Sequence, residues 1–344
     1  MLYNSKQNDI NLGEENILTI AEIAKLAGVS SAAVSRYLNH GYISEEKRQK
    51  IKKVIEQTGY RPSLQAQTLR TKKSKLIGIV LPKINSETIS RIVAGISQVL
   101  SEKGFQILLA NTENNVNKEL EYLSVFQNNN VEGIIFIATL LNKEHKSIIK
   151  QIDVPVVIIG QKVDYASCIY HNDYLAAKQL TEIMLCNGRK QIAYIGVTIK
   201  DKAAGFERKK GYLDALKSYH IAINENVMTE SDFSMESGYE AMKRLLKQQE
   251  YIDGIFCATD FIAIGAMKYL KEKQISIPQQ IQIVGIGHTK LSEIITPTLT
   301  TAHFYYKTSG QDGAQMLLDL LKEQKKVIKE MKLGFEIIEQ ESTK

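Results

Sequence analysis

The stretch LTIAEIAKLAGVSSAAVSRYLN, residues 18–39, carries the start and end signals of two short helices. Thr19 and Glu22 have the spacing of a capping box, in which two side chains satisfy the free backbone amides at a helix start. Gly28 is expected to end this first helix, and Ser30 is the expected N-cap of a second. Two helices joined by a tight turn that contains glycine predict a helix-turn-helix module.

A third predicted helix, from Ser44 to Gly59, would brace this pair and complete a DNA-binding domain over residues 17–62. The second helix of such a module lies in the major groove, so its outward side chains must be short enough for the backbone to approach the bases. A long donor is also needed to bind a guanine edge or a phosphate. The residues that meet these demands are Ser31, Ala32, Ser35 and the donor Arg36. The alternative is a solvated helix face that includes an incidental arginine.

Charge is segregated along the chain. The net charge is +6, yet residues 17–75 alone contain twelve Lys and Arg against four Asp and Glu, and residues 76–344 are balanced. A basic head on a neutral body is typical of a protein that binds a polyanion. Residues 1–16 are slightly acidic and have no helix signal, so we expect them to be disordered.

Residues 63–75 follow Pro62 and contain about two turns of helical pattern with basic residues behind them. A helix this short is marginal in water by itself. We therefore predict a hinge helix and linker here that forms when DNA stabilises it.

From residue 76 onward, apolar strands alternate with helical segments. Continuous apolar strands separated by helices indicate parallel sheets covered on both faces, and the chain is long enough for two such α/β units. Ligands in this architecture bind beyond the carboxyl ends of the strands. The predicted strands are 76–81, 106–111, 133–138, 154–160, 191–197, 253–259 and 281–287, and the predicted helices are 88–103, 117–129, 173–187, 205–219, 236–249 and 261–273.

Several classes of protein are disfavoured. The three cysteines form no CxxC pair and the six histidines have no metal-ligand spacing, so we assign no metal site. No phosphate-binding loop, GxSxG or HExxH motif is present, and we assign no catalytic residue and no cofactor. An N-terminal signal pattern and a membrane-spanning apolar run are both missing, so we expect a cytoplasmic protein and no membrane partner.

Taken together, these motifs resemble the lactose/galactose repressor (LacI/GalR) family of transcriptional regulators. The resemblance lies in the quoted stretch 18–39, in TGYRPSLQAQTLR (58–70), in KLIGIVLPKINSE (75–87), in NGRKQIAYIG (187–196) and in the segment from DGIFCATDF (253–261) to PTLTTAHF (297–304). It implies a helix-turn-helix head and hinge helix joined to a core like the periplasmic sugar-binding proteins. The implied N-subdomain covers about 76–172 and 304–332, and the C-subdomain about 173–303 and 333–344.

The resemblance implies a homodimer that binds a palindromic double-stranded operator. Ser31, Ala32 and Arg36 would face bases, Ser30 and Ser35 would be positioned toward phosphates, and Leu69 would be a wedge between base steps. The other residues implied in DNA binding are Thr19, Asn39, Tyr60, Ser63 and Ala66. The chain ends without a leucine-heptad tail, which favours a dimer over a tetramer.

In the core, the resemblance implies a cleft for a small sugar or sugar phosphate. Arg208 matches an arginine that forks onto sugar hydroxyls, and Phe233 matches an aromatic side chain that stacks on a sugar, although a core position for Phe233 fits the pattern nearly as well. The other implied effector residues are Ser86, Thr88, Gln161, Thr259, Asp260, His288 and Tyr306. Two carboxylates of the family pattern are missing, because Gly160 and the Gly287–His288 pair stand where acids are common.

The function implied is a repressor of a carbohydrate-utilisation operon that a sugar or sugar-phosphate effector releases. The alternative within the family is a corepressor-dependent global regulator of carbon catabolism, whose core binds a phosphorylated carrier protein. Neither the effector's identity nor the operator sequence follows from the residues.

Overall fold

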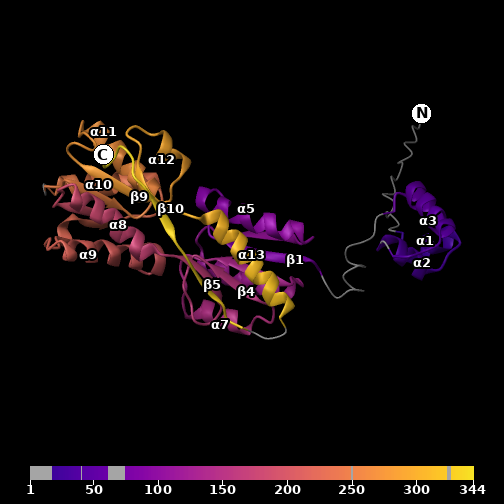
Figure 1. The fold of residues 1–344 in the computed structure, drawn as a ribbon. Helices are drawn as coiled ribbons and strands as arrows, with labels where there is room; N and C mark the ends of the chain where they lie inside the picture. The colour runs from indigo at the N-terminus through magenta and orange to yellow at the C-terminus, as the bar shows by residue number, and fades with distance from the viewer. Residues whose placement is uncertain (1–17, 40, 61–73, 249–250, 324–326) are drawn as a thin grey trace, which may run out of the picture. The chain divides into compact units, whose positions relative to one another are not determined.

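The computed structural model describes residues 18–39, 41–60, 74–248, 251–323 and 327–344. The chain divides between Ser74 and Lys75 into a small N-terminal unit and a large core unit, and the ribbon of each is drawn in Figure 1. None of the described helices is long and apolar enough to span a bilayer.

The N-terminal unit is a three-helix head. Its helices are α1 (Ile20–Ala27), α2 (Ser31–Leu38) and α3 (Glu45–Thr58). The predicted capping box is present: the Thr19 amide donates to Glu22 Oε2 at 2.7 Å, and the Glu22 amide donates to Thr19 Oγ1 at 3.3 Å. Gly28 ends α1 in the left-handed region at φ 63°, where a residue without a Cβ is favoured. Ile23, Val34 and Ile51 form the fully buried centre of the head.

The core unit contains two subdomains, each a six-stranded sheet covered by helices on both faces. In the first, every pairing is parallel and the strand order is β11-β5-β4-β3-β1-β2. The strands are β1 (Leu76–Leu81), β2 (Gln106–Asn111), β3 (Gly133–Ile137), β4 (Val156–Ile159), β5 (Ser167–His171) and β11 (Glu330–Leu333). Helices α5 (Glu87–Glu102) and α13 (Tyr306–Lys322) cover one face, and α6 (Val116–Asn128) and α7 (Lys143–Gln151) cover the other.

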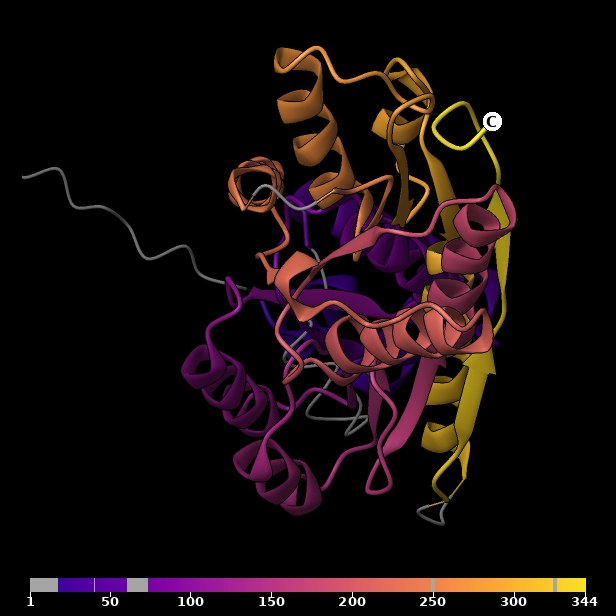
Figure 2. The same cartoon turned by 90° about the vertical axis from the view of Figure 1, so that its left-hand side faces the viewer.

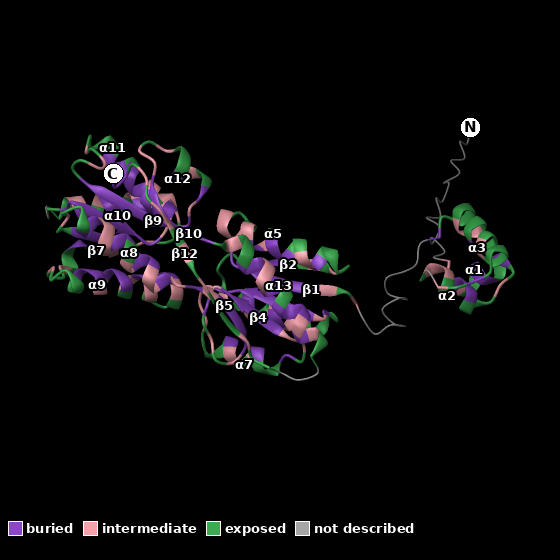
Figure 3. Cartoon of the chain, in the orientation of Figure 1, coloured by how far each residue is buried: buried purple, intermediate pink, exposed green. Residues whose placement is uncertain are grey.

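The second subdomain has the strand order β12-β10-β9-β8-β6-β7, with only β12 antiparallel to its neighbour. Its strands are β6 (Ile192–Gly196), β7 (Met228–Glu230), β8 (Gly254–Cys257), β9 (Gln282–Ile286), β10 (Thr300–Phe304) and β12 (Phe335–Ile338). One face packs on α8 (Asp173–Cys186) and α9 (Arg208–Ser218), the other on α10 (Met235–Lys247) and α11 (Asp260–Glu272). Three short helices complete it: η1 (Lys202–Glu207), η2 (Glu225–Val227) and α12 (Lys290–Ile294). Figure 3 shows the central strands of both sheets as buried and the outer helix faces as exposed.

These two sheets confirm the predicted fold class of a helix-turn-helix head with a periplasmic-binding-protein-like core. Each strand and helix predicted for the head and the core is present, with ends shifted by a few residues, whereas the predicted hinge helix lies outside the described residues. The chain crosses between subdomains after β5, after β10 and after β11, and Figure 2 shows the yellow C-terminal strands running from one subdomain to the other. Phe304 still belongs to the second sheet and Leu333 to the first, one residue beyond the limits expected from the sequence.

Close helix pairs in each subdomain depend on glycine. A methyl group at Gly310 of α13 would overlap the carbonyl oxygen of Ile92 in α5, and one at Gly95 of α5 would overlap the carbonyl oxygen of Lys307. Backbone atoms cannot move aside as a flexible side chain can, so a larger residue must push the two helices apart.

We therefore expect Gly310→Ala to lower the free energy of unfolding by about 1–3 kcal/mol, the usual range for overpacking a tight contact. Gly334→Ala is the matched control, because no atom lies within 4 Å of the added methyl group. Urea unfolding of the full chain measures both variants. Equal losses in the two would contradict this account of the α5–α13 contact.

Candidate functional sites

Helix α2 presents a face of small side chains to solvent. Ser31, Ala32 and Arg36 are exposed, whereas Ala33 and Val34 of the same helix are buried in the head. This division follows the helical period, so one side of α2 packs on α1 and α3 and the other is open. The exposed side is the one predicted from the sequence to approach DNA.

Other predicted DNA-binding residues of the head also hold its structure. The Ser30 hydroxyl accepts from the Ala33 amide at 3.2 Å, which confirms its role as N-cap of α2. Thr19 belongs to the capping box, and the Asn39 side-chain amide donates to the carbonyl of half-buried Ser35 at 2.5 Å. Tyr60 is in the core of the head and only 9% exposed, because its ring fills space beside the buried aliphatic residues. It is therefore not part of the open face. Ser63, Ala66 and Leu69 lie outside the described residues.

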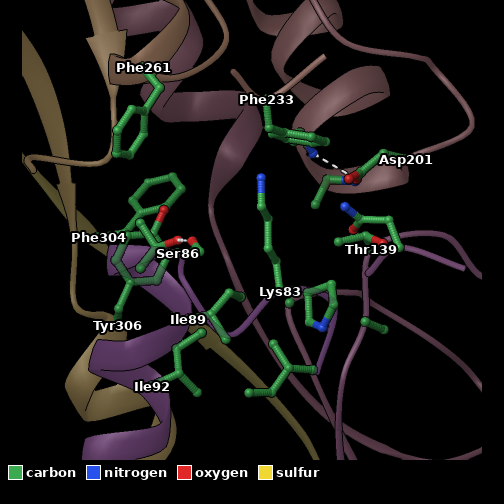
Figure 4. Close-up of a pocket in the computed structure, with 18 of the residues that line it drawn as sticks. Lys83, Ser86, Ile89, Ile92, Thr139, Asp201, Phe233, Phe261, Phe304 and Tyr306 are labelled. Carbon is green, nitrogen blue, oxygen red and sulfur yellow. Dashed lines mark hydrogen bonds between the residues drawn. The ribbon is translucent and has the colours of Figure 1, made fainter. Parts of the chain in front are cut away.

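A cavity of about 340 Å³ lies between the two subdomains of the core, and Figure 4 shows many of its residues. Both sheets contribute the loops that follow their strands, as expected for parallel sheets. Six predicted effector residues line it: Ser86, Thr88, Gln161, Arg208, Phe233 and Tyr306. Phe233 is 43% exposed, which places it on the cavity wall and not in the protein core.

Thr259, Asp260 and His288 were predicted to bind the effector, but the structure places them outside the cavity lining. Asp260 is fully buried and accepts from the Thr301 hydroxyl at 2.5 Å and from the Thr289 amide at 2.8 Å. Thr259 is the N-cap of α11 and accepts from the Ile262 amide. These bonds fix the loops after β8 and β9, so Thr259 and Asp260 stabilise the fold behind the site.

His288 makes its contacts outside the cavity lining. Its Nδ1 is 2.9 Å from Nδ1 of His303, and its Nε2 is 3.0 Å from Glu293. Its carbonyl accepts from Arg91 Nη1 of the first subdomain at 3.1 Å. This contact and the bonds from the Lys290 amide to the Glu87 carboxylate join α5 to the loop after β9.

Arg208 reaches the cavity as predicted, but its charge already has a partner. Its Nε donates to Asp173 Oδ1 at 2.8 Å, and its Nη1 donates to the carbonyl of Ala258. Both side chains are buried. Burial opposes the charged guanidinium most strongly, but Asp173, together with Tyr306 and Asp201, more than offsets it, and the pKa of Arg208 is raised.

Sequence reasoning missed three buried polar residues of the cavity: Asp173, which pairs with Arg208, and also Asp201 and His171. Asp201 caps η1 and accepts from Gln161 Nε2 across the cleft at 2.8 Å. His171 ends β5 and stacks on Phe304 with the ring centroids 4.6 Å apart. Burial, together with nearby Arg208, lowers the pKa of His171 to about 3, so its imidazole is neutral. The sequence offered no usable signal for His171, because the strand that it ends, β5, was not predicted.

Further cavity residues that the sequence did not single out are Lys83, Asn85, Asn114, Thr139, Glu236, Phe261 and Phe304. In the described part of the chain, no group of three or more His, Cys, Asp or Glu side chains is arranged to hold a metal ion.

Comparison with known proteins agrees with this architecture. Residues 19–63 match the bacterial regulatory proteins of the lacI family, and residues 181–343 match a periplasmic binding protein-like domain. The sucrose operon repressor of Staphylococcus xylosus is 32% identical over 320 residues, which cover 92% of this chain and 99% of that protein. This chain belongs to the lacI family.

Two further proteins extend the comparison. Catabolite control protein A of Priestia megaterium is 29% identical over 287 residues, 83% of this chain and 86% of that protein. The lac repressor dimer bound to operator and the anti-inducer ONPF superposes with a TM-score of 0.87 at 23% identity, covering 95% of this chain and 99% of that one. It shows that the lacI-family fold extends over head and core alike.

For this member of the lacI family, the Arg208–Asp173 pair yields a test. We expect Asp173→Asn to lower the free energy of unfolding by about 3–5 kcal/mol, because a buried cation would lose its counter-charge. The matched control is Asp164→Asn, which removes an exposed pair with Lys146 at 3.1 Å and should cause no measurable change. Thermal and urea unfolding measure both. A stable Asp173→Asn protein would show that the pair does not hold α8 against α9.

Proposed function

We propose that the protein is a transcriptional repressor whose affinity for operator DNA is controlled by a sugar or sugar phosphate bound in the core cavity. The observation that carries the proposal is the combination of an open α2 face with Arg36 in the head and a polar–aromatic cavity between the two core subdomains. We further propose that it acts in the cytoplasm, without catalytic activity, cofactor or metal.

In this proposal, two copies of the chain bind one palindromic duplex. A symmetric dimer presents two α2 helices to two half-sites, so the symmetry of the DNA matches that of the protein. Phosphate contacts from the basic head supply most of the affinity and make it depend on salt. The named relatives support this proposal, since the solved lac repressor is described as a dimer bound to operator.

The cavity can couple ligand binding to DNA binding, because its walls come from both subdomains. Gln161 of the first subdomain and Asp201 of the second meet across it, and Arg91 reaches the carbonyl of His288 outside the cavity lining. A ligand that contacts both walls stabilises one relative position of the subdomains over others. When that position is unsuitable for placing two heads on DNA, the ligand weakens operator binding.

The second candidate function is a corepressor-dependent global regulator, favoured by the 29% identity to catabolite control protein A. In that case a phosphorylated carrier protein, and not a sugar alone, would strengthen DNA binding. Operator binding measured with and without the phosphorylated carrier distinguishes the two functions.

Arg36 provides the direct test of DNA binding. Palindromic duplexes are first selected from random DNA with the full chain, and binding is then measured by fluorescence anisotropy. We expect Arg36→Ala to weaken binding to the selected duplex by about 5- to 100-fold, the effect of losing one good base contact. Arg36→Lys keeps the charge without the planar fork, so it should bind random DNA normally and the selected duplex weakly.

Lys103→Ala is the matched control, since it removes the same charge from an exposed position in the core unit. It should bind like the wild type. Selection that yields no palindrome, or an Arg36→Ala protein that binds the selected duplex as tightly as the wild type, would contradict the proposed role of α2.

A further inference from the structure

The charges around the cavity distinguish a free sugar from its phosphate ester. Three of the charged residues are buried in the interior, namely Arg208, Asp173 and Asp201, and two are exposed, namely Lys83 and Glu236. We propose that the ligand is an uncharged mono- or disaccharide and that the cavity excludes the corresponding sugar phosphates. This inference rests on the proposed function and specifies the ligand.

The interior offers no unbalanced positive charge to a phosphate. Arg208 is held by Asp173 at 2.8 Å and also donates to the Ala258 carbonyl. Among the described residues that line the cavity, Arg208 is in an ion pair and Lys83 is the one lysine or arginine that is not. Figure 4 shows the Lys83 side chain extending between Ser86 and Asp201. Lys83 and Glu236 are both exposed on the cavity lining. Water therefore screens the positive charge of the lysine, and the carboxylate of Glu236 offsets it.

Asp201 places a carboxyl group in the cavity lining, where burial raises its pKa but hydrogen bonds from neighbouring donors favour its charged form. Its Oδ1 accepts all three hydrogen bonds that the described residues make to this carboxylate, from Gln161 Nε2 and from the amides of Ala203 and Ala204. Oδ2 is left to accept from a ligand hydroxyl. A phosphate dianion has only acceptor oxygens, so it would meet this carboxylate with repulsion and without a hydrogen bond.

His171 has the same preference for a neutral partner. Its ring is buried against Phe304, and its Nε2 has no hydrogen-bond partner among the described residues. An unsatisfied buried nitrogen costs free energy until a partner reaches it. A sugar hydroxyl can pair with Nε2 in both tautomers of the neutral imidazole, as a donor to one and an acceptor from the other. A phosphate dianion can pair only with the tautomer that carries its proton on Nε2.

The aromatic wall completes the match to an unmodified sugar. Phe233, Phe261, Phe304 and Tyr306 line the cavity, and Figure 4 shows the first of these across the cavity from the other three. Flat apolar rings bury the C–H faces of a sugar ring, while a few polar groups fix its orientation.

The first experiment compares matched pairs of probes by calorimetric titration of the full chain. The pairs are sucrose with sucrose 6-phosphate, glucose with glucose 6-phosphate, and fructose with fructose 6-phosphate. We expect at least one parent sugar to bind, and to bind at least tenfold more tightly than its phosphate. A phosphate that binds more tightly than its parent, or no binding by any member of any pair, would overturn the inference.

Operator binding measured with the same probes separates this inference from the proposed function. If a parent sugar binds with the expected preference but leaves operator affinity unchanged, the inference stands and the proposed function fails. If a sugar phosphate binds best and shifts operator affinity, the proposed function stands and the inference fails.

The second experiment tests the two polar groups. We expect His171→Phe to weaken binding of the preferred sugar by about tenfold, the effect of losing one hydrogen bond. Tyr194→Phe is the matched control, because the Tyr194 hydroxyl is also buried without a partner in the described chain but lies outside the cavity lining. Tyr194→Phe should bind the sugar normally.

Asp201→Asn should weaken binding of the parent sugar. It should also lower the ratio of the affinity for the sugar to the affinity for its phosphate at least threefold. Thermal unfolding of each variant identifies loss of folding, and the Asp201→Asn ratio is then read from protein that remains folded. Sugar binding that is equal in the wild type, His171→Phe and Asp201→Asn would contradict the assignment of these groups.

Discussion

The edge at which the two parallel sheets meet is the constraint on which the rest of the structure depends. In a parallel sheet every strand ends on the same side, so the loops of one subdomain gather at one edge. Three chain crossings hold the two such edges against each other, and the cavity forms from both. The buried Arg208–Asp173 pair lies at this edge, where it ties α9 to α8 and sets the charge that a ligand meets.

The head follows a different constraint. Its core is small, with eight buried side chains among the described residues, so the capping bonds at Thr19 and Ser30 and the left-handed glycines are a large part of what defines its helices. The polar groups that cap α2 lie beside the residues proposed to contact DNA. Ser30 therefore defines where the helix starts, and the small side chains of Ser31 and Ala32 leave its exposed face flat enough to enter a DNA groove.

The sequence predicted those elements whose residues are uniform in character. The strands β1, β3, β4, β6, β8 and β9 are continuous apolar runs, and they were expected almost at their observed ends. Strand β5 was not expected, because SCIYH mixes polar and apolar residues, and neither was α7, whose apolar positions are few. Helix α13 was missed as well, and its tight contact with α5 uses glycines, which the sequence gives no reason to place inside a helix.

The candidate site was predictable only where a residue's type matched a known role. Arg208, Phe233 and Gln161 line the cavity, but Asp260 supports the loops behind it, because a carboxylate at a strand end can serve either purpose. Asp201 and His171 were missed since each is a single polar residue in an unremarkable context. Only the fold reveals that Asp201 faces Gln161 of the other subdomain and that His171 is left with an unpartnered nitrogen.

The central claim is that the cavity ligand and the operator compete through the relative position of the two subdomains. Its most direct test is the affinity of the full chain for its preferred sugar, measured by calorimetry alone and with saturating palindromic duplex. Because coupling between sites is reciprocal, bound duplex should lower the affinity for the sugar by the same factor by which bound sugar lowers the affinity for the duplex. The account predicts a factor of about 5- to 150-fold. Equal sugar affinity in the two titrations would contradict it.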